Sequence, residues 1–257
     1  MGRPLLSEIP KIYRNSLKPA DSMFNIYLAR PLAAVLVAAL AKTRVTPNQV
    51  TIISIVPMLL AVAAFIALPG HLGLWLGVLG VELAYILDCA DGQLARVTGR
   101  SSPVGGELDF LIDEIKAFLL IAALTVRWAL EAESGSVYPY WVGISTLALL
   151  GMALSLTKFV RTDVYADATG QERKRHGQSV AEAHNRKTPL WPVLMLARLI
   201  SQYPVCLPIF ALFNRMDLFV WAYGVVHMLY AGQTTLGICF RLGRFDRVER
   251  HPDGGSE

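Results

Sequence analysis

The apolar residues of this chain fall into long blocks separated by short polar connections. Each block is close to the roughly 20 residues that a helix needs to cross the hydrocarbon core of a membrane. The pattern therefore predicts an all-α integral membrane protein with six transmembrane helices. We expect these helices at about residues 49–69, 73–97, 104–131, 138–161, 189–213 and 216–241.

A further apolar stretch, residues 24–42, precedes these blocks and has basic residues at both ends. Lys18 lies before it, Arg30 lies in its first half, and Lys42 and Arg44 close it. Because cations mark the cytoplasmic side of a span, two basic flanks favour an N-terminal amphipathic helix in the interface over a seventh crossing. With six spans, the connections rich in Lys and Arg share one side, so we expect both termini in the cytoplasm.

The pattern divides the chain into three parts. We expect an N-terminal cytoplasmic segment with the interfacial helix over residues 1–45, a transmembrane catalytic domain over 46–245 and a disordered tail over 246–257. The polar stretch 162–188 predicts a cytoplasmic loop, with or without a short helix.

Composition agrees with a membrane protein, because 17% of the residues are charged, against about 25% in soluble domains. The net charge of +4 is modest, and no basic stripe is interleaved with aromatic residues, which excludes a nucleic-acid partner. The three cysteines are too scattered for a disulfide framework.

Four aspartates carry the candidate chemistry. Asp88 and Asp91 are three residues apart at the end of the second expected span, and Asp109 and Asp113 are four apart in the third. On a helix, either spacing places the pair on one face. The short connection at residues 99–103 makes the two helices antiparallel neighbours, so the four carboxylates can converge in a cleft near the cytoplasmic surface.

Such a cluster needs cations. Each carboxylate inside a bilayer costs on the order of 3 kcal/mol, and four together repel one another. Mg²⁺ or Mn²⁺ suits oxygen ligands, and two such ions can hold the attacking and leaving oxygens of a phosphoryl transfer. Arg96 and Arg100 cannot balance four acids, which disfavours a structural salt-bridge cluster; Lys116 is a further candidate for balancing the acids.

A membrane cation transporter is the alternative function, because buried acids also mark ion pathways. A transporter would spread its acids through several spans and membrane depths. In this chain the acids gather at one end of two consecutive helices, which favours an enzyme.

The spacing Asp88-x2-Asp91-Gly92-x2-Ala95-Arg96-x8-Gly105-x3-Asp109-x3-Asp113 resembles the full signature of the CDP-alcohol phosphotransferases. The resemblance implies that a CDP-linked donor, usually CDP-diacylglycerol, gives its phosphatidyl group to an alcohol and releases CMP, in phospholipid biosynthesis. It also implies a multi-pass protein of a bacterial cell membrane, with a cytoplasmic active site and possible homodimers. The complete signature argues against a catalytically idle copy.

The same resemblance implies roles for single residues. Asp88, Asp91, Asp109 and Asp113 would hold two ions, Mg²⁺ or Mn²⁺, and Asp113 would also be the general base. The CDP pocket would be formed by Asn48, Asp88, Gly92, Ala95, Arg96 and Gly105.

The acceptor pocket is less sharply indicated. Ser155, Lys158 and Arg161 end the fourth expected span at helical spacing, and Arg241 ends the sixth at the same depth. This set resembles the anion pocket of family members that use a phosphorylated acceptor, such as inositol phosphate or glycerol phosphate. Basic residues at the cytoplasmic ends of spans are also explained by the orientation of the protein in the membrane alone. The sequence therefore does not identify the acceptor alcohol.

Overall fold

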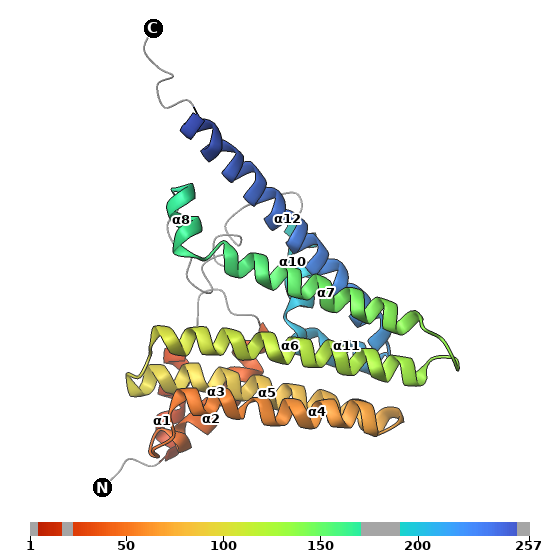
Figure 1. Cartoon of the computed structure of the whole chain (residues 1–257). Helices are drawn as coiled ribbons and strands as arrows, with labels where there is room; N and C mark the ends of the chain where they lie inside the picture. The colour runs from red at the N-terminus through yellow and green to blue at the C-terminus, as the bar shows by residue number, and fades with distance from the viewer. Residues whose placement is uncertain (1–4, 17–22, 171–190, 251–257) are drawn as a thin grey trace.

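The computed structural model describes residues 5–16, 23–170 and 191–250, and all regular structure in these ranges is helical (Figure 1). This confirms the all-α class. The helices are α1 (Leu5–Ser16), the π-helix η1 (Asn25–Ala29), α2 (Arg30–Leu40), α3 (Pro47–Ile53), α4 (Ile55–Ala67), α5 (Gly70–Thr98), α6 (Pro103–Glu131), α7 (Tyr138–Phe159), α8 (Asp163–Thr169), α10 (Trp191–Ser201), α11 (Tyr203–Leu212) and α12 (Met216–Arg250).

Three helical stretches of the described chain are long and apolar enough to cross a membrane: Pro47–Ala67, which joins α3 and α4, then α5 and α7. A fourth is reached if the bent pair α10 and α11 is one span. Large apolar side chains such as Leu60, Trp141 and Ile144 are more than 60% exposed, as lipid-facing residues are. These helices mark an integral membrane protein.

The six expected spans are therefore only partly matched. Helices α6 and α12 occupy the expected ranges 104–131 and 216–241. They are long enough to cross a membrane, but they contain too many charged or weakly hydrophobic residues to count among the apolar helices that can do so. Six crossings stay a prediction.

The long helices α4, α5 and α6 lie side by side, and α7 packs beside α6 and pairs with the more steeply inclined α12 (Figure 1). Helices α3 and α4 pack against both α5 and α6. A buried apolar core joins these layers and α11, and it fixes the aspartate-bearing ends of α5 and α6. Its largest buried side chains are Met58, Phe65, Leu74, Leu120, Ile121, Leu124, Leu150, Leu207 and Phe219.

The turn between α5 and α6 is short, as predicted for residues 99–103. Gly99 adopts a left-handed conformation with φ of 66°, which glycine takes without a Cβ penalty. The Arg100 N–H donates back to Ala95 O at 2.9 Å, which closes the end of α5. Helix α6 then begins at once, because the Ser102 side chain accepts from Gly105 N at 3.0 Å.

The expected N-terminal helix over residues 24–42 forms as η1 followed by α2. Helix α1, which the sequence pattern did not predict, packs against α2, and the Tyr13 hydroxyl donates to Ile26 O at 3.0 Å. The face of α2 that packs on its neighbours α1 and α5 is made of small residues, Ala33, Ala34, Val37 and Ala38. Whether α2 lies in the membrane interface stays a prediction.

The span expected at residues 189–213 forms as two helices, because α10 and α11 meet at an angle of 86°, and its crossing of the membrane stays a prediction. Gln202 leaves the helical region, with φ −85° and ψ 72°. Pro204 has no N–H to donate to Ile200 O, so the helix cannot continue through this point. The Cys206 thiol lies 3.6 Å from that carbonyl oxygen.

The C-terminal boundary also differs from the prediction. Helix α12 runs to Arg250, so residues 246–250 are helical and not part of a disordered tail. Their sequence, DRVER, consists mostly of residues that favour helices. Residues 251–257 lie outside the described ranges. Of the polar stretch 162–188, the structure describes the short helix α8, and residues 171–190 lie outside the described ranges.

Candidate active site

The N-terminus of α3 forms one wall of the site. Thr46 and Gln49 form a reciprocal capping box: the Thr46 N–H donates to Gln49 Oε1 at 2.9 Å, and the Gln49 N–H donates to Thr46 Oγ1 at 3.3 Å. Pro47 occupies the first helical turn, where its missing N–H costs nothing. These local interactions fix Asn48 and Thr51 on the turns that face α5 and α6.

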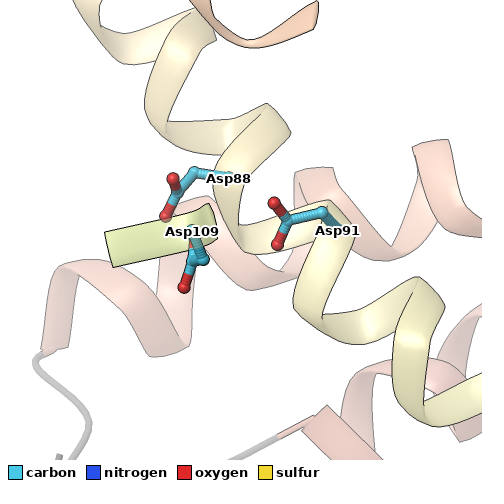
Figure 2. Close-up of side chains that lie close together, drawn as sticks. All are labelled: Asp88, Asp91 and Asp109. Atoms are coloured by element: carbon cyan, nitrogen blue, oxygen red, sulfur yellow. The ribbon is translucent and has the colours of Figure 1, made fainter. Parts of the chain in front are cut away.

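Three of the four aspartates come together. Asp88 and Asp91 project from α5 and Asp109 projects from α6 toward the same space (Figure 2). Each offers one carboxylate oxygen, and these oxygens all lie within 4.8 Å of one another. A set of hard oxygen donors gathered in this way suits a divalent metal ion.

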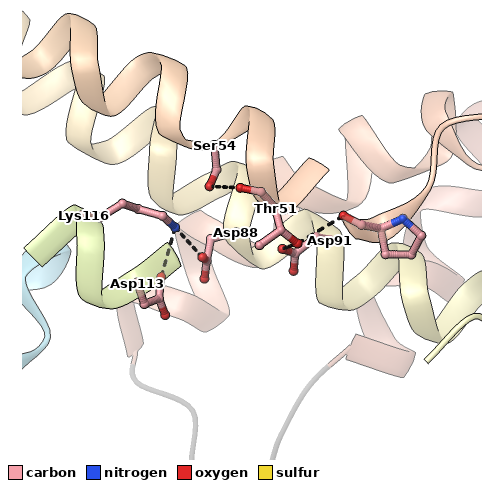
Figure 3. A network of polar contacts seen from close by, with 7 residues as sticks. Thr51, Ser54, Asp88, Asp91, Asp113 and Lys116 are labelled. Atoms are coloured by element: carbon pink, nitrogen blue, oxygen red, sulfur yellow. Dashed lines mark hydrogen bonds and ion pairs between the residues drawn. The ribbon is translucent and has the colours of Figure 1, made fainter. Parts of the chain in front are cut away.

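Asp113 joins this group through a lysine. Lys116 Nζ donates to Asp88 Oδ1 at 2.5 Å and to Asp113 Oδ1 at 3.0 Å (Figure 3). The lysine side chain is 1% exposed, that of Asp88 14% and that of Asp113 42%. The expectation that Lys116 balances the acids is confirmed. Its contact with Asp88 on α5 was not predicted from the sequence.

Asp91 is oriented from α3. The Thr51 hydroxyl donates to Asp91 Oδ2 and also lies 3.2 Å from Pro47 O (Figure 3). Thr51 and Asp91 are both buried. The Ser54 hydroxyl donates to Thr51 O at 2.6 Å, one turn further along. Three helices thus contribute to the polar cluster.

A first cavity of about 180 Å³ adjoins Asp91 and Asp109. Of the residues expected to bind CDP, Asn48, Gly92, Ala95, Arg96 and Gly105 line this cavity, whereas Asp88 does not. The remaining lining residues are Pro47, Thr51, Arg100, Ser101, Ser102 and Gly106.

The shape and charge of the first cavity suit a phosphate-bearing ligand. A Cβ atom at Gly105 would lie 3.0 Å from Asn48 Oδ1, so glycine keeps the wall clear. Arg96 and Arg100 are exposed and supply two guanidinium groups at the rim. Guanidinium groups bind phosphate oxygens through paired hydrogen bonds.

A second cavity, of about 270 Å³, adjoins Asp113. Three tyrosines and one phenylalanine contribute to its wall, together with a second carboxylate and the bend between α10 and α11. It is lined by Tyr85, Phe110, Asp113, Glu114, Ala117, Leu150, Leu154, Ser201, Gln202, Tyr203, Pro204, Tyr223 and His227. The aspartates of one cluster therefore face two different cavities.

The part of the chain that carries these residues matches a known protein family. The family model described as CDP-alcohol phosphatidyltransferase matches residues 44–214, which include the aspartates and both walls of the first cavity. The chain belongs to this family. It is accordingly a transferase, as the resemblance of its aspartate signature predicted.

Several curated proteins are similar to part of this CDP-alcohol phosphatidyltransferase. A bifunctional IPC transferase and DIPP synthase of Thermococcus kodakarensis is 32% identical over 119 residues, which are 46% of this chain and 24% of the relative. An archaetidylinositol phosphate synthase of Pyrococcus horikoshii is 38% identical over 95 residues, 35% of this chain and 47% of the relative.

A phosphatidylinositol phosphate synthase of Corynebacterium glutamicum is 34% identical over 99 residues, 38% of this chain and 42% of the relative. In each case the match spans less than half of the relative's own length.

The four residues expected around the acceptor of this transferase are not all brought together. Lys158 pairs with Glu114 at 2.5 Å, and its Nζ lies 5.6 Å from the centre of the Phe110 ring. The Arg161 guanidinium lies 5.1 Å from the same ring. Both cations therefore lie near the rim of the second cavity, whereas Ser155 and Arg241 are exposed and line neither cavity.

Sequence reasoning did not identify Thr51, Arg100 and Ser102 as lining residues of the first cavity. Thr51 is a polar residue three positions after Asn48, the residue expected to bind CDP, in a largely apolar run, and that contrast was a usable signal. Arg100 and Ser102 lie inside the aspartate signature at positions that the signature leaves free.

Proposed function

We propose that this enzyme transfers a phosphatidyl, or other phospho-alcohol, group from a CDP-linked donor to an alcohol and releases CMP, in phospholipid biosynthesis. CDP-diacylglycerol is the proposed donor. One observation carries the proposal: a single carboxylate cluster adjoins two separate cavities, one through Asp91 and Asp109 and the other through Asp113. A transfer between two substrates needs such a shared centre.

The first cavity would hold the CDP group of the donor. Arg96 would bind its pyrophosphate, and Asn48 would contact the nucleotide. Gly92, Ala95 and Gly105 would let the ligand approach the helix backbones closely. Asp88, Asp91, Asp109 and Asp113 would hold two divalent ions, Mg²⁺ or Mn²⁺, and Asp88 would also contact the CDP group. Such ions neutralise the pyrophosphate and the charge that develops on the CMP leaving group.

The second cavity would admit the acceptor alcohol. Asp113 lines it and is the most exposed member of the Asp88–Lys116–Asp113 bridge, so it would accept the proton of the acceptor hydroxyl as general base. Lys158 and Arg161, with Ser155 and Arg241, would bind an acceptor phosphate. The names of the relatives support inositol phosphate as the first acceptor to test, with glycerol phosphate as the next.

The membrane arrangement is part of the proposal. Residues 46–245 would form the catalytic domain with six crossings, in a bacterial cell membrane. The ends of α5 and α6 that carry the aspartates would face the cytoplasm, as would both termini. Residues 1–45 would lie on the membrane surface, and two copies would form a homodimer.

An acceptor screen tests the reaction. Purified protein in detergent would receive CDP-diacylglycerol, Mn²⁺ or Mg²⁺, and inositol, inositol phosphate, glycerol phosphate or serine, and CMP and lipid products would be identified by mass. We expect CMP and one lipid product whose mass names the acceptor. If no acceptor yields CMP while vesicles with the protein take up Mn²⁺, the chain is a transporter.

A further inference from the structure

Lys116 is a buried cation placed between two acidic residues of different helices. Its side chain is 1% exposed, and its Nζ contacts Asp88 on α5 and Asp113 on α6. The three-carboxylate group of Asp88, Asp91 and Asp109 does not include Asp113. The carboxylate pair Asp88 and Asp113 is thus already neutralised in part by the chain itself.

A lysine in this position affects ion binding. An ion that bridged Asp88 and Asp113 would lie within a few ångströms of the ammonium group, and like charges at that distance repel strongly in a partly buried site. Asp88 can still bind an ion together with Asp91 and Asp109, because a carboxylate has two oxygens and only one of them contacts Lys116. The two ion positions are therefore not electrostatically equivalent.

We propose that Lys116 is a built-in counter-cation that makes the two ion positions unequal. One divalent ion binds tightly at Asp88, Asp91 and Asp109. A second ion, at Asp88 and Asp113, binds only by competing with the ammonium group. This inference rests on the proposed function, in which the aspartates hold divalent ions.

The test counts ions and does not depend on turnover. Purified protein without nucleotide is titrated with Mn²⁺, and free Mn²⁺ is followed by electron paramagnetic resonance. We expect wild type to show one tight site, with any second site at least about tenfold weaker because of the lysine charge. Lys116→Met should then show two sites, with the second strengthened at least about tenfold.

Two further variants make the result specific. Arg215→Gln removes one positive charge from an exposed pair with Asp217 and should titrate like wild type. The double variant Asp113→Asn with Lys116→Met removes both members of one ion pair, which limits the loss of stability, and should return to one tight site.

The outcomes separate the two proposals. Two sites of equal affinity in wild type would overturn the role of Lys116 whether or not any variant folds. A folded Lys116→Met protein with the wild-type isotherm would do the same. A wild-type chain that binds no Mn²⁺ at all would instead contradict the proposed function.

Discussion

Thr51 orients Asp91 from a neighbouring helix, through a buried hydroxyl that donates to the carboxylate. Thr51→Val keeps the shape of the side chain but removes the donor. Loss of a hydrogen bond of about 1 kcal/mol corresponds to a roughly fivefold lower affinity for the ion. We expect the Mn²⁺ concentration for half-maximal CMP release to rise by that factor, and Thr51→Ser to restore it. Equal Mn²⁺ dependence in Thr51→Val and wild type would exclude this role.

Asp113 is proposed as the base that accepts the acceptor's proton. Asp113→Asn has nearly the same shape but cannot accept that proton, so turnover should fall at least about 100-fold. Glu107→Gln, an exposed position on the same helix, is the matched control and should keep full activity. Melting temperatures of both variants check folding. An active Asp113→Asn protein would mean that the base has been assigned to the wrong residue.

At the residue scale, the sequence predicted what depends on spacing within one helix. Asp88 with Asp91, and Asp109 with Asp113, share helix faces because of their separations of three and four. The contact of Lys116 with Asp88 joins residues 28 positions apart, and that of Thr51 with Asp91 joins residues 40 apart. Such contacts depend on how the helices rotate about their axes, which spacing alone does not determine.

At the scale of helices, Arg127 closes the end of α4 far from the aspartates. It is 3% exposed and donates to Phe65 O and Leu68 O, both at 3.3 Å, and to Gly70 O at 2.8 Å. Arg127→Met would remove the donor from these three carbonyl oxygens, of which that of Phe65 is buried, and lower the free energy of unfolding by about 2 kcal/mol or more.

Thermal unfolding in detergent measures this effect. Activity per folded molecule should change little, because Arg127 is about 20 Å along α6 from Asp113. Arg215→Gln breaks an exposed pair and should change the stability by less than about 1 kcal/mol. If both arginine variants unfold at the same temperature, the carbonyl contacts of Arg127 do not stabilise the helix end.

Helix α6 also sets the width of the first cavity. Gly105→Ala would place a methyl group 3.0 Å from Asn48 Oδ1, so the wall must shift. We expect KM for the CDP-linked donor to rise about tenfold from this overpacking. Gly232→Ala on α12 is the matched control, because a Cβ there meets nothing within 4 Å and Gly232 lines neither cavity. Equal KM values for the two variants would show that Gly105 does not set the width of the donor site.

The sequence predicted helices where capping and apolar length agree, as in the turn from α5 to α6. It missed α1 because twelve residues with mixed polarity give no span signal, and their helix is held by packing on α2. It also missed the bend before α11, because the apolar length of residues 189–213 predicts one span, whereas the local signal for the bend is the missing N–H of Pro204.

At the scale of the whole molecule, the site combines a lipid-facing exterior with a polar interior. Exposed apolar side chains surround the helices that qualify as spans. The polar cluster lies where the C-terminal end of α5 and the N-terminal ends of α3 and α6 meet. A donor with a lipid tail and a water-soluble nucleotide needs both environments at one place, which this arrangement provides.

In the proposed reaction, divalent ions held by the aspartates activate a CDP-linked donor. The most direct measurement is CMP release from CDP-diacylglycerol by the purified protein, in the presence of an acceptor, as free Mn²⁺ is varied. We predict that EDTA stops CMP release and that Mn²⁺ in excess of the chelator restores it. CMP release that continues unchanged in EDTA, or that never occurs with any acceptor at any Mn²⁺ or Mg²⁺ concentration, would contradict the account.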